Sequence, residues 1–287
     1  MGMILDSGAF SAWTKKTEID LDEYIHFYKR HKRYIDYIVN LDVIPGEWGR
    51  TPTKAEAEKA CDKGFENYDY MLSKNIPHEK LIHVFHMGDD YSYLERMFAE
   101  CTDYIGISPA NDKTTGQKIK WLDTVYGDYV CDKKGMPKVR THGFGVTALN
   151  IMIRYPWYSA DSTSWTLTSR FGCIFLPVKR KGKYDHGITP LKINFSSRPS
   201  KPDKFNYNNG VGPALKKYVD EYIQDKGFTL GKSEFDADGK EVIIEEGLVN
   251  HYLHRDLANI EYFEDVERYI PKYPWAFQKQ KRMGFSL

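Results

Sequence analysis

The 287-residue chain has little net charge and few cysteines, and each shortage excludes a class of protein. The formal net charge is +1, so any surface that attracts a polyanion must be local. Neither a disulfide framework nor a cysteine-rich zinc site is expected, because the cysteines are far apart and form no Cys-x-x-Cys pair. They are Cys61, Cys101, Cys131 and Cys173. This spacing favours reduced thiols inside a cell.

Long apolar runs are also missing. No run approaches the length of a membrane span, and residues 1–10 lack the basic and apolar regions of a signal peptide. We therefore expect a cytoplasmic protein, in the host cytoplasm if the chain is viral, without a membrane partner. The first expected strand, residues 3–5, is not followed by a Gly-rich phosphate loop, which argues against an open dinucleotide-binding sheet.

What the chain does contain is an alternation of short apolar strands and amphipathic helices. Strands are expected at residues 3–5, 34–41, 81–85, 104–109 and 139–144 and in the stretch before Asp161, with helices at 21–33, 53–74, 91–99 and 117–129. This pattern predicts parallel strands buried on both sides, and we expect an α/β fold, a (β/α)₈ TIM-like barrel with a C-terminal helical extension.

The second part of the chain is less regular. A buried strand is expected at 171–178, a loop at 199–209, and helices at 215–224, 242–257 and 260–269. We expect residues 1–195 to form the barrel core. Residues 196–287 would supply the remaining barrel elements and a helical, basic extension, all within one structural domain.

Polar side chains follow the expected strands, as on the active face of a (β/α)₈ barrel. They are Asp6, Asp42, His86, Ser108, His142 and Asp161. When two carboxylates lie in one pocket, one can act as a nucleophile and the other as a general acid or base. Each aspartate taken alone has a structural alternative. Asp161-Ser162-Thr163-Ser164 is also good helix-capping chemistry.

Several of these stretches resemble motifs of the tRNA-guanine transglycosylases, in that family's order. Asp6-Ser7-Gly8-Ala9-Phe10-Ser11 resembles Asp-Ser-Gly-Gly-Phe-Gln, and Leu41-Asp42 resembles the segment of the base-recognition aspartate. Gly106-Ile107-Ser108 is similar to Gly-Gly-Leu, and His142-Gly143-Phe144-Gly145-Val146-Thr147 to Met-Gly-Val-Gly-Thr-Pro. Ser159-Ala160-Asp161-Ser162 resembles the nucleophile segment. The likeness covers roughly residues 4 to 165. The run around Tyr158 and Trp165 also resembles phage transglycosylases that put 7-deazaguanines into DNA, the DpdA family.

The resemblance implies a base-exchange reaction through a covalent glycosyl-enzyme. Asp161 would attack C1′ of a guanosine nucleotide, and Asp6 would accept a proton from the incoming 7-deazaguanine, a preQ0-type base. Asp42 would accept hydrogen bonds from the purine. The remaining contacts to the base are expected from Ser7, Gly8, Phe10, Gly106, Ile107, His142 and Tyr158, with Phe10 or Tyr158 stacking on the ring.

The chain also departs from the family pattern. Ser11 replaces Gln, and His86-Met87-Gly88-Asp89 replaces Val-Gln-Gly-Gly, so recognition of the base is expected to differ. The family's zinc motif, Cys-x-Cys-x-x-Cys with a distant His, has no counterpart after Asp161, and we expect no cofactor. The missing zinc motif favours DNA as the polymer partner. Action on tRNA, hydrolysis in place of exchange, and a non-catalytic barrel that binds nucleic acid stay open as alternatives.

The basic cluster and two histidine pairs complete the candidates. Phosphate contact is expected from Lys179, Arg180, Lys181 and Lys183, with a solvated loop as the equal alternative. His83 and His86 lie three apart on a strand and face opposite sides, which disfavours a shared metal. His251 and His254 lie on one helical face and are expected to be surface or core residues.

Overall fold

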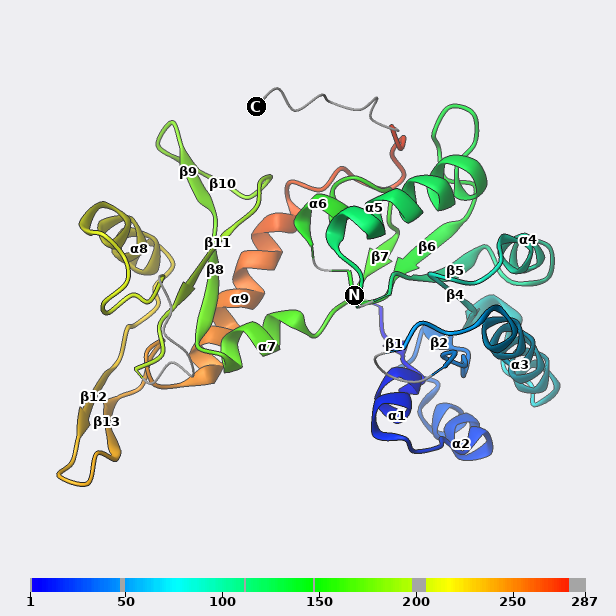
Figure 1. The fold of residues 1–287 in the computed structure, drawn as a ribbon, viewed down its shortest axis with the longest axis horizontal. Helices are drawn as coiled ribbons and strands as arrows, with labels where there is room; N and C mark the ends of the chain where they lie inside the picture. The colour runs from blue at the N-terminus through cyan, green and yellow to red at the C-terminus, as the bar shows by residue number, and fades with distance from the viewer. Residues whose placement is uncertain (1, 47–49, 111, 147, 198–204, 279–287) are drawn as a thin grey trace. The chain divides into compact units, whose positions relative to one another are not determined.

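The computed structural model describes residues 2–46, 50–110, 112–146, 148–197 and 205–278 (Figure 1). The chain divides into two compact units. The first comprises Met1–Val146, Arg154–Asp161 and Tyr273–Leu287, and the second Thr147–Ile153 and Ser162–Lys272. Among the described residues, no helix has the length and apolar character needed to cross a bilayer.

Parallel strands form the centre of the first unit. One sheet has the order β1 (Ile4–Leu5), β2 (Tyr37–Val39), β3 (Leu81–Ile82), and the other β4 (Val84–His86), β5 (Tyr104–Ser108), β6 (Arg140–Gly143), β7 (Ser159–Ala160). Every pairing in both sheets is parallel. The predicted α/β class is therefore confirmed. Within the described residues no strand pairing links β7 to β1, so a closed barrel is not established.

Helices connect these strands and pack on them. They are α1 (Ala9–Lys15), α2 (Leu21–His31), α3 (Lys54–Ser73), α4 (Tyr91–Glu100) and α5 (Thr115–Thr124), with a 3₁₀ turn His78–Lys80 and a π-helical turn Val125–Val130. Figure 1 shows α2 to α5 on the outer side of the strands. Tyr24, Ile25 and Tyr28 of α2 are buried in the same cluster as Ile38 and Leu81 of the sheet. The helix starts follow capping chemistry, since Thr53 and Glu56 form a capping box that begins α3.

The second unit has a different architecture. It contains α6 (Leu149–Met152), α7 (Ser164–Arg170), α8 (Pro213–Asp225) and α9 (Tyr252–Glu267). Its strands form three antiparallel pairs, β8 (Cys173–Leu176) with β11 (Leu191–Asn194), β9 (Val178–Arg180) with β10 (Lys183–Asp185), and β12 (Lys232–Phe235) with β13 (Glu241–Glu245). The strand expected at 171–178 is present as β8, but its partner β11 runs antiparallel to it.

The prediction of a helix at 242–257 is wrong for the first half of that range. Glu241–Glu245 is strand β13, and α9 begins only at Tyr252. The Asp236 side chain accepts hydrogen bonds from the backbone N–H groups of Asp238 and Lys240, and Gly239 takes a positive φ of 73°. This turn sends the chain back as a hairpin, and the β-branched residues that follow suit a strand.

Candidate active site

Three aspartates lie beyond the carboxyl ends of parallel strands in the first unit. Asp6 follows β1, Asp161 follows β7, and Asp42 lies three residues beyond β2. Directly after Asp6, Gly8 has a φ of 76° and turns the chain into α1. Because the strands within each sheet are parallel, each of these side chains lies at the carboxyl end of its own sheet.

The charges of the other two aspartates act on Asp6. Its pKa is raised above the usual carboxyl range by desolvation and, in addition, by the negative charges of Asp42 and Asp161, while the backbone N–H groups of Ser7 and Gly8 oppose the shift. The Asp6 side chain is exposed to solvent, although the surrounding protein partly desolvates its carboxylate. A carboxyl group whose pKa is raised in this way is a better proton acceptor than an ordinary surface aspartate.

Asp42 is held by two donors from different segments. The Ser7 hydroxyl donates to Oδ1 over 3.2 Å, and His86 Nε2 lies 2.8 Å from Oδ2. Asp89 accepts from the backbone N–H of His86 at 2.8 Å, and its carboxylate also lies 3.5 Å from His86 Nδ1. Burial disfavours the imidazolium, but the hydrogen bonds to Asp42 and Asp89 outweigh it and raise the pKa of His86 well above its usual range. His86 is therefore a cation at neutral pH and fixes the Asp42 carboxylate.

A second hydrogen-bonded chain runs towards Asp161. Tyr104 Oη and His142 Nδ1 lie 2.5 Å and 2.6 Å from the Ser159 hydroxyl, and His142 Nε2 lies 3.4 Å from Asp161 Oδ1. The backbone N–H of Gly145 donates to the same carboxylate oxygen over 3.3 Å. Asp161 keeps 58% of its side chain exposed, whereas His142 is buried. Asp161 is thus open to solvent while Gly145 and His142 hold its carboxylate in place, as a nucleophile requires.

Two expected base contacts lie inside the sheet. The Gly106 N–H donates to the His83 carbonyl over 2.7 Å, and the Ile107 carbonyl accepts from the Phe144 N–H over 3.0 Å. A Cβ on Gly106 would lie 2.5 Å from the Phe144 ring, so glycine is required there for packing. The contact of this segment with a base stays a prediction, and Ser108 is the first residue of the motif at the strand end.

The structure does not bring Tyr158 together with the aspartates. Its ring centroid lies 5.2 Å from the Tyr104 ring, and the Arg140 guanidinium lies 5.2 Å from the same centroid. Those partners begin β5 and β6, so Tyr158 lies at the amino ends of the strands, opposite to Asp161. Phe10 on α1 is 44% exposed and lies four residues after Asp6, so of the two proposed stacking residues it is the one near the site.

The basic cluster lies on the β9–β10 hairpin of the second unit. Lys179 pairs with Glu221 at 2.7 Å, and Arg180 lies 3.9 Å from Asp185. Lys181 and Lys183 flank the hairpin tip and are exposed. The hairpin presents positive charge to solvent.

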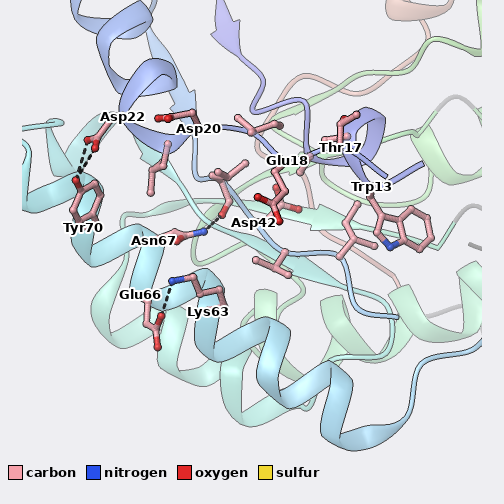
Figure 2. A pocket seen from close by; sticks show the side chains of 17 residues that line it. Trp13, Thr17, Glu18, Asp20, Asp22, Asp42, Lys63, Glu66, Asn67 and Tyr70 are labelled. Carbon is pink, nitrogen blue, oxygen red and sulfur yellow. Dashed lines mark hydrogen bonds and ion pairs between the residues drawn. The ribbon is translucent and has the colours of Figure 1, made fainter. Parts of the chain in front are cut away.

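A pocket of about 860 Å³ adjoins Asp42 (Figure 2). It lies between α1, the segment leading into α2, the chain after β2, and α3; its lining includes Asp42 but neither Asp6 nor Asp161. Five of the described lining residues are acidic, against one lysine: Glu18, Asp20, Asp22, Asp42 and Glu66 against Lys63. Such a lining repels phosphate and suits a ligand that presents hydrogen-bond donors.

Two sets of contacts were not foreseen from the sequence. Asp42 pairs with Ser7 and His86, and His142 pairs with Ser159. The His-x-x-Asp motif that begins at the last residue of β4 is the one local signal for the pairing of His86 with a carboxylate. Among the described residues, side chains able to gather around a metal ion occur at Glu246, His251 and His254 in the second unit.

Comparison with protein-family models and with curated proteins found no match for this chain.

Proposed function

We propose that this protein is a glycosyltransferase that exchanges guanine in DNA for a 7-deazaguanine base through a covalent aspartyl-glycosyl intermediate. The observation that carries the proposal is the set of three strand-end aspartates, of which Asp42 and Asp161 both act on the pKa of Asp6. Asp42 is anchored by the imidazolium of His86, and Asp161 faces solvent. This division fits one residue for base recognition, one for attack and one for proton transfer.

A (β/α)₈-type barrel is the architecture we propose for the first unit. The parallel strands neighbour one another in chain order, as barrel strands do. Asp6 follows the first strand and Asp161 the last strand of this series, yet the charge of Asp161 still reaches Asp6. A curved sheet accounts for that approach better than a flat one does.

In the first half-reaction Asp161 would attack C1′ of the nucleotide as the bond from C1′ to guanine N9 breaks. The departing base needs a proton, and Asp6, whose pKa is raised by burial and by the charges of Asp42 and Asp161, would supply it. The products are free guanine and a sugar esterified to Asp161. The hydrogen bond from the Gly145 N–H and the nearby His142 ring, 3.4 Å away, hold the Asp161 carboxylate in position.

In the second half-reaction the incoming 7-deazaguanine would give its N9 proton to Asp6 and attack C1′, which releases Asp161. Asp42 would hold the base in both steps. A carboxylate offers about four acceptor positions, and Ser7 and His86 occupy two of them, which leaves places for the purine N1–H and amino group. The target guanine must leave the duplex stack to reach these residues.

The test is incorporation of labelled guanine into duplex DNA, single-stranded DNA and tRNA in parallel. Label in DNA alone supports the proposal, whereas label in tRNA alone assigns the enzyme to tRNA. Asp161→Asn and Asp6→Asn should each remove incorporation, and denaturing mass spectrometry should find a sugar–protein adduct in the wild type but not in Asp161→Asn. Asp69→Asn, an exposed aspartate on α3, is the matched control.

Full exchange by Asp161→Asn and Asp6→Asn would rule the mechanism out. Abasic product without incorporation would show hydrolysis instead. No label and no adduct with any polymer would favour a barrel that only binds nucleic acid.

A further inference from the structure

Three potential metal ligands converge where β13 leads into α9 in the second unit. One ligand atom from each of Glu246, His251 and His254 lies within 4.8 Å of the others. His254 Nε2 and Glu246 Oε2 are 3.9 Å apart, and the two imidazole rings meet edge to face with centroids 5.7 Å apart. The residues belong to one short segment, so their convergence is a property of this unit alone.

The backbone between Glu246 and His251 is held in place by its own hydrogen bonds. Asn250 is central to this: its Oδ1 accepts from the Gly247 N–H at 2.9 Å, and its amide donates to the Glu245 carbonyl at 2.8 Å and the Ser233 hydroxyl at 2.9 Å. Gly247 packs directly on the Gly231 backbone, where a Cβ would lie 2.3 Å from the Gly231 nitrogen. The loop therefore presents its side chains from a fixed support, as a ligand site requires.

His251 has a feature that a purely structural role does not explain. Its Nδ1 is buried and has no hydrogen-bond partner among the described residues. His251 is the first, non-helical residue at the start of α9, but its side chain makes no capping bond. A buried ring nitrogen without a partner is costly, and a bound cation is one of the few partners that would satisfy it.

We propose that Glu246, His251 and His254 bind a divalent transition-metal ion of the zinc class. Two imidazoles and one carboxylate form a ligand set that zinc uses in three-ligand sites, with the fourth position left for water or another small ligand. Metal–ligand bonds of about 2.0–2.2 Å require the ligand atoms to approach to roughly 3.3 Å. Glu246 has 59% of its side chain exposed and is free to make most of that movement.

The bound ion would fasten the end of β13 to the first turn of α9. The amino end of a helix carries partial positive charge and so opposes a cation slightly, and the Glu246 carboxylate offsets this. Magnesium and calcium prefer oxygen ligands and would bind poorly to this set. The proposal does not rest on glycosyl transfer, since all three ligands lie in the second unit.

The test is equilibrium dialysis of the full chain, first treated with chelator, against Zn²⁺ and separately against Mg²⁺. We expect one equivalent of Zn²⁺ and no comparable Mg²⁺. Glu246→Gln and His254→Ala should each weaken Zn²⁺ binding at least about tenfold, because each removes one of three ligands. Glu246→Gln changes an exposed residue and should leave folding intact. Its matched control is Glu245→Gln, which changes the neighbouring carboxylate.

Cobalt replacement distinguishes this site from zinc capture by the cysteines. Co²⁺ held by imidazole and carboxylate shows visible d–d bands without the near-ultraviolet charge-transfer band of thiolate ligands. A thiolate band, or zinc binding unchanged in both Glu246→Gln and His254→Ala, would overturn the proposal. So would equal loss on replacing His26, an exposed histidine of α2, with alanine.

Discussion

His86 Nε2 lies 2.8 Å from Asp42 Oδ2, although the two residues are 44 positions apart in the chain. The histidine comes from the end of β4 and the aspartate from the segment after β2. Because the ring also faces Asp89, it is flanked by two carboxylates and is held as the imidazolium. The acceptor proposed for the purine is thus anchored by the imidazolium of His86.

Replacing His86 with alanine should therefore impair use of the base more than the chemical step. Loss of a hydrogen bond to a charged group costs about 1.5–3 kcal/mol, which corresponds to a roughly 10- to 100-fold rise in KM for the incoming base. Steady-state exchange with varied base concentration measures this. His26→Ala is the control, and an unchanged KM in His86→Ala would show that Asp42 does not need this anchor.

The raised pKa of Asp6 predicts a pH-dependent effect on stability. Folding favours the protonated carboxyl, so the ionised form destabilises the fold at a pH above the raised pKa, and this penalty is absent below the ordinary carboxyl pKa. Asp6→Asn should unfold at a higher temperature than wild type at pH 8, and the difference should shrink as the pH falls towards 3 to 4. Thermal melts across pH measure it, with Asp69→Asn expected to show no such trend.

Ser159 is predicted to position His142 rather than to bind substrate. Its hydroxyl is shared by His142 and Tyr104, and His142 in turn faces Asp161. Ser159→Ala should lower kcat about tenfold, the cost of one buried hydrogen bond, with little change in KM. Ser159→Thr keeps the hydroxyl and should recover most of the loss. Equal loss in the alanine and threonine variants would assign the defect to packing instead, and Ser73→Ala on α3 is the neutral control.

Gly106 is predicted to be indispensable for packing of the sheet. An added methyl group would lie 2.5 Å from the Phe144 ring and 3.2 Å from the Val84 side chain, and overpacking of this kind costs about 1–3 kcal/mol. Urea unfolding of Gly106→Ala should show that loss, and adding Phe144→Leu should restore part of it. Gly116→Ala on α5, where a Cβ meets nothing within 4 Å, should instead be neutral or slightly stabilising.

Most helices and strands of the first unit could be predicted from capping residues and hydrophobic periodicity in the sequence. The start of α2 at Leu21, the capping of α3 by Thr53 and the strand Tyr104–Ser108 were all predicted to within a few residues. Caps and hydrophobic periodicity act over a few neighbouring residues, so they can be recognised without knowledge of the fold. The hairpin at Glu241 was missed because the periodicity of so short an apolar run does not distinguish a helix from a strand, and pairing with β12 decided the outcome.

By itself the sequence determined the alternation of parallel strands and helices in the first unit, and the carboxylates that follow β1, β2 and β7. Both depend on residue order within a short stretch. Only the tertiary structure decided that His86 anchors Asp42, that Asp161 acts on Asp6, and that Tyr158 lies at the other end of the strands. These relations join segments tens of residues apart, and strand register and packing set them, because a shift of one residue turns a side chain to the opposite face.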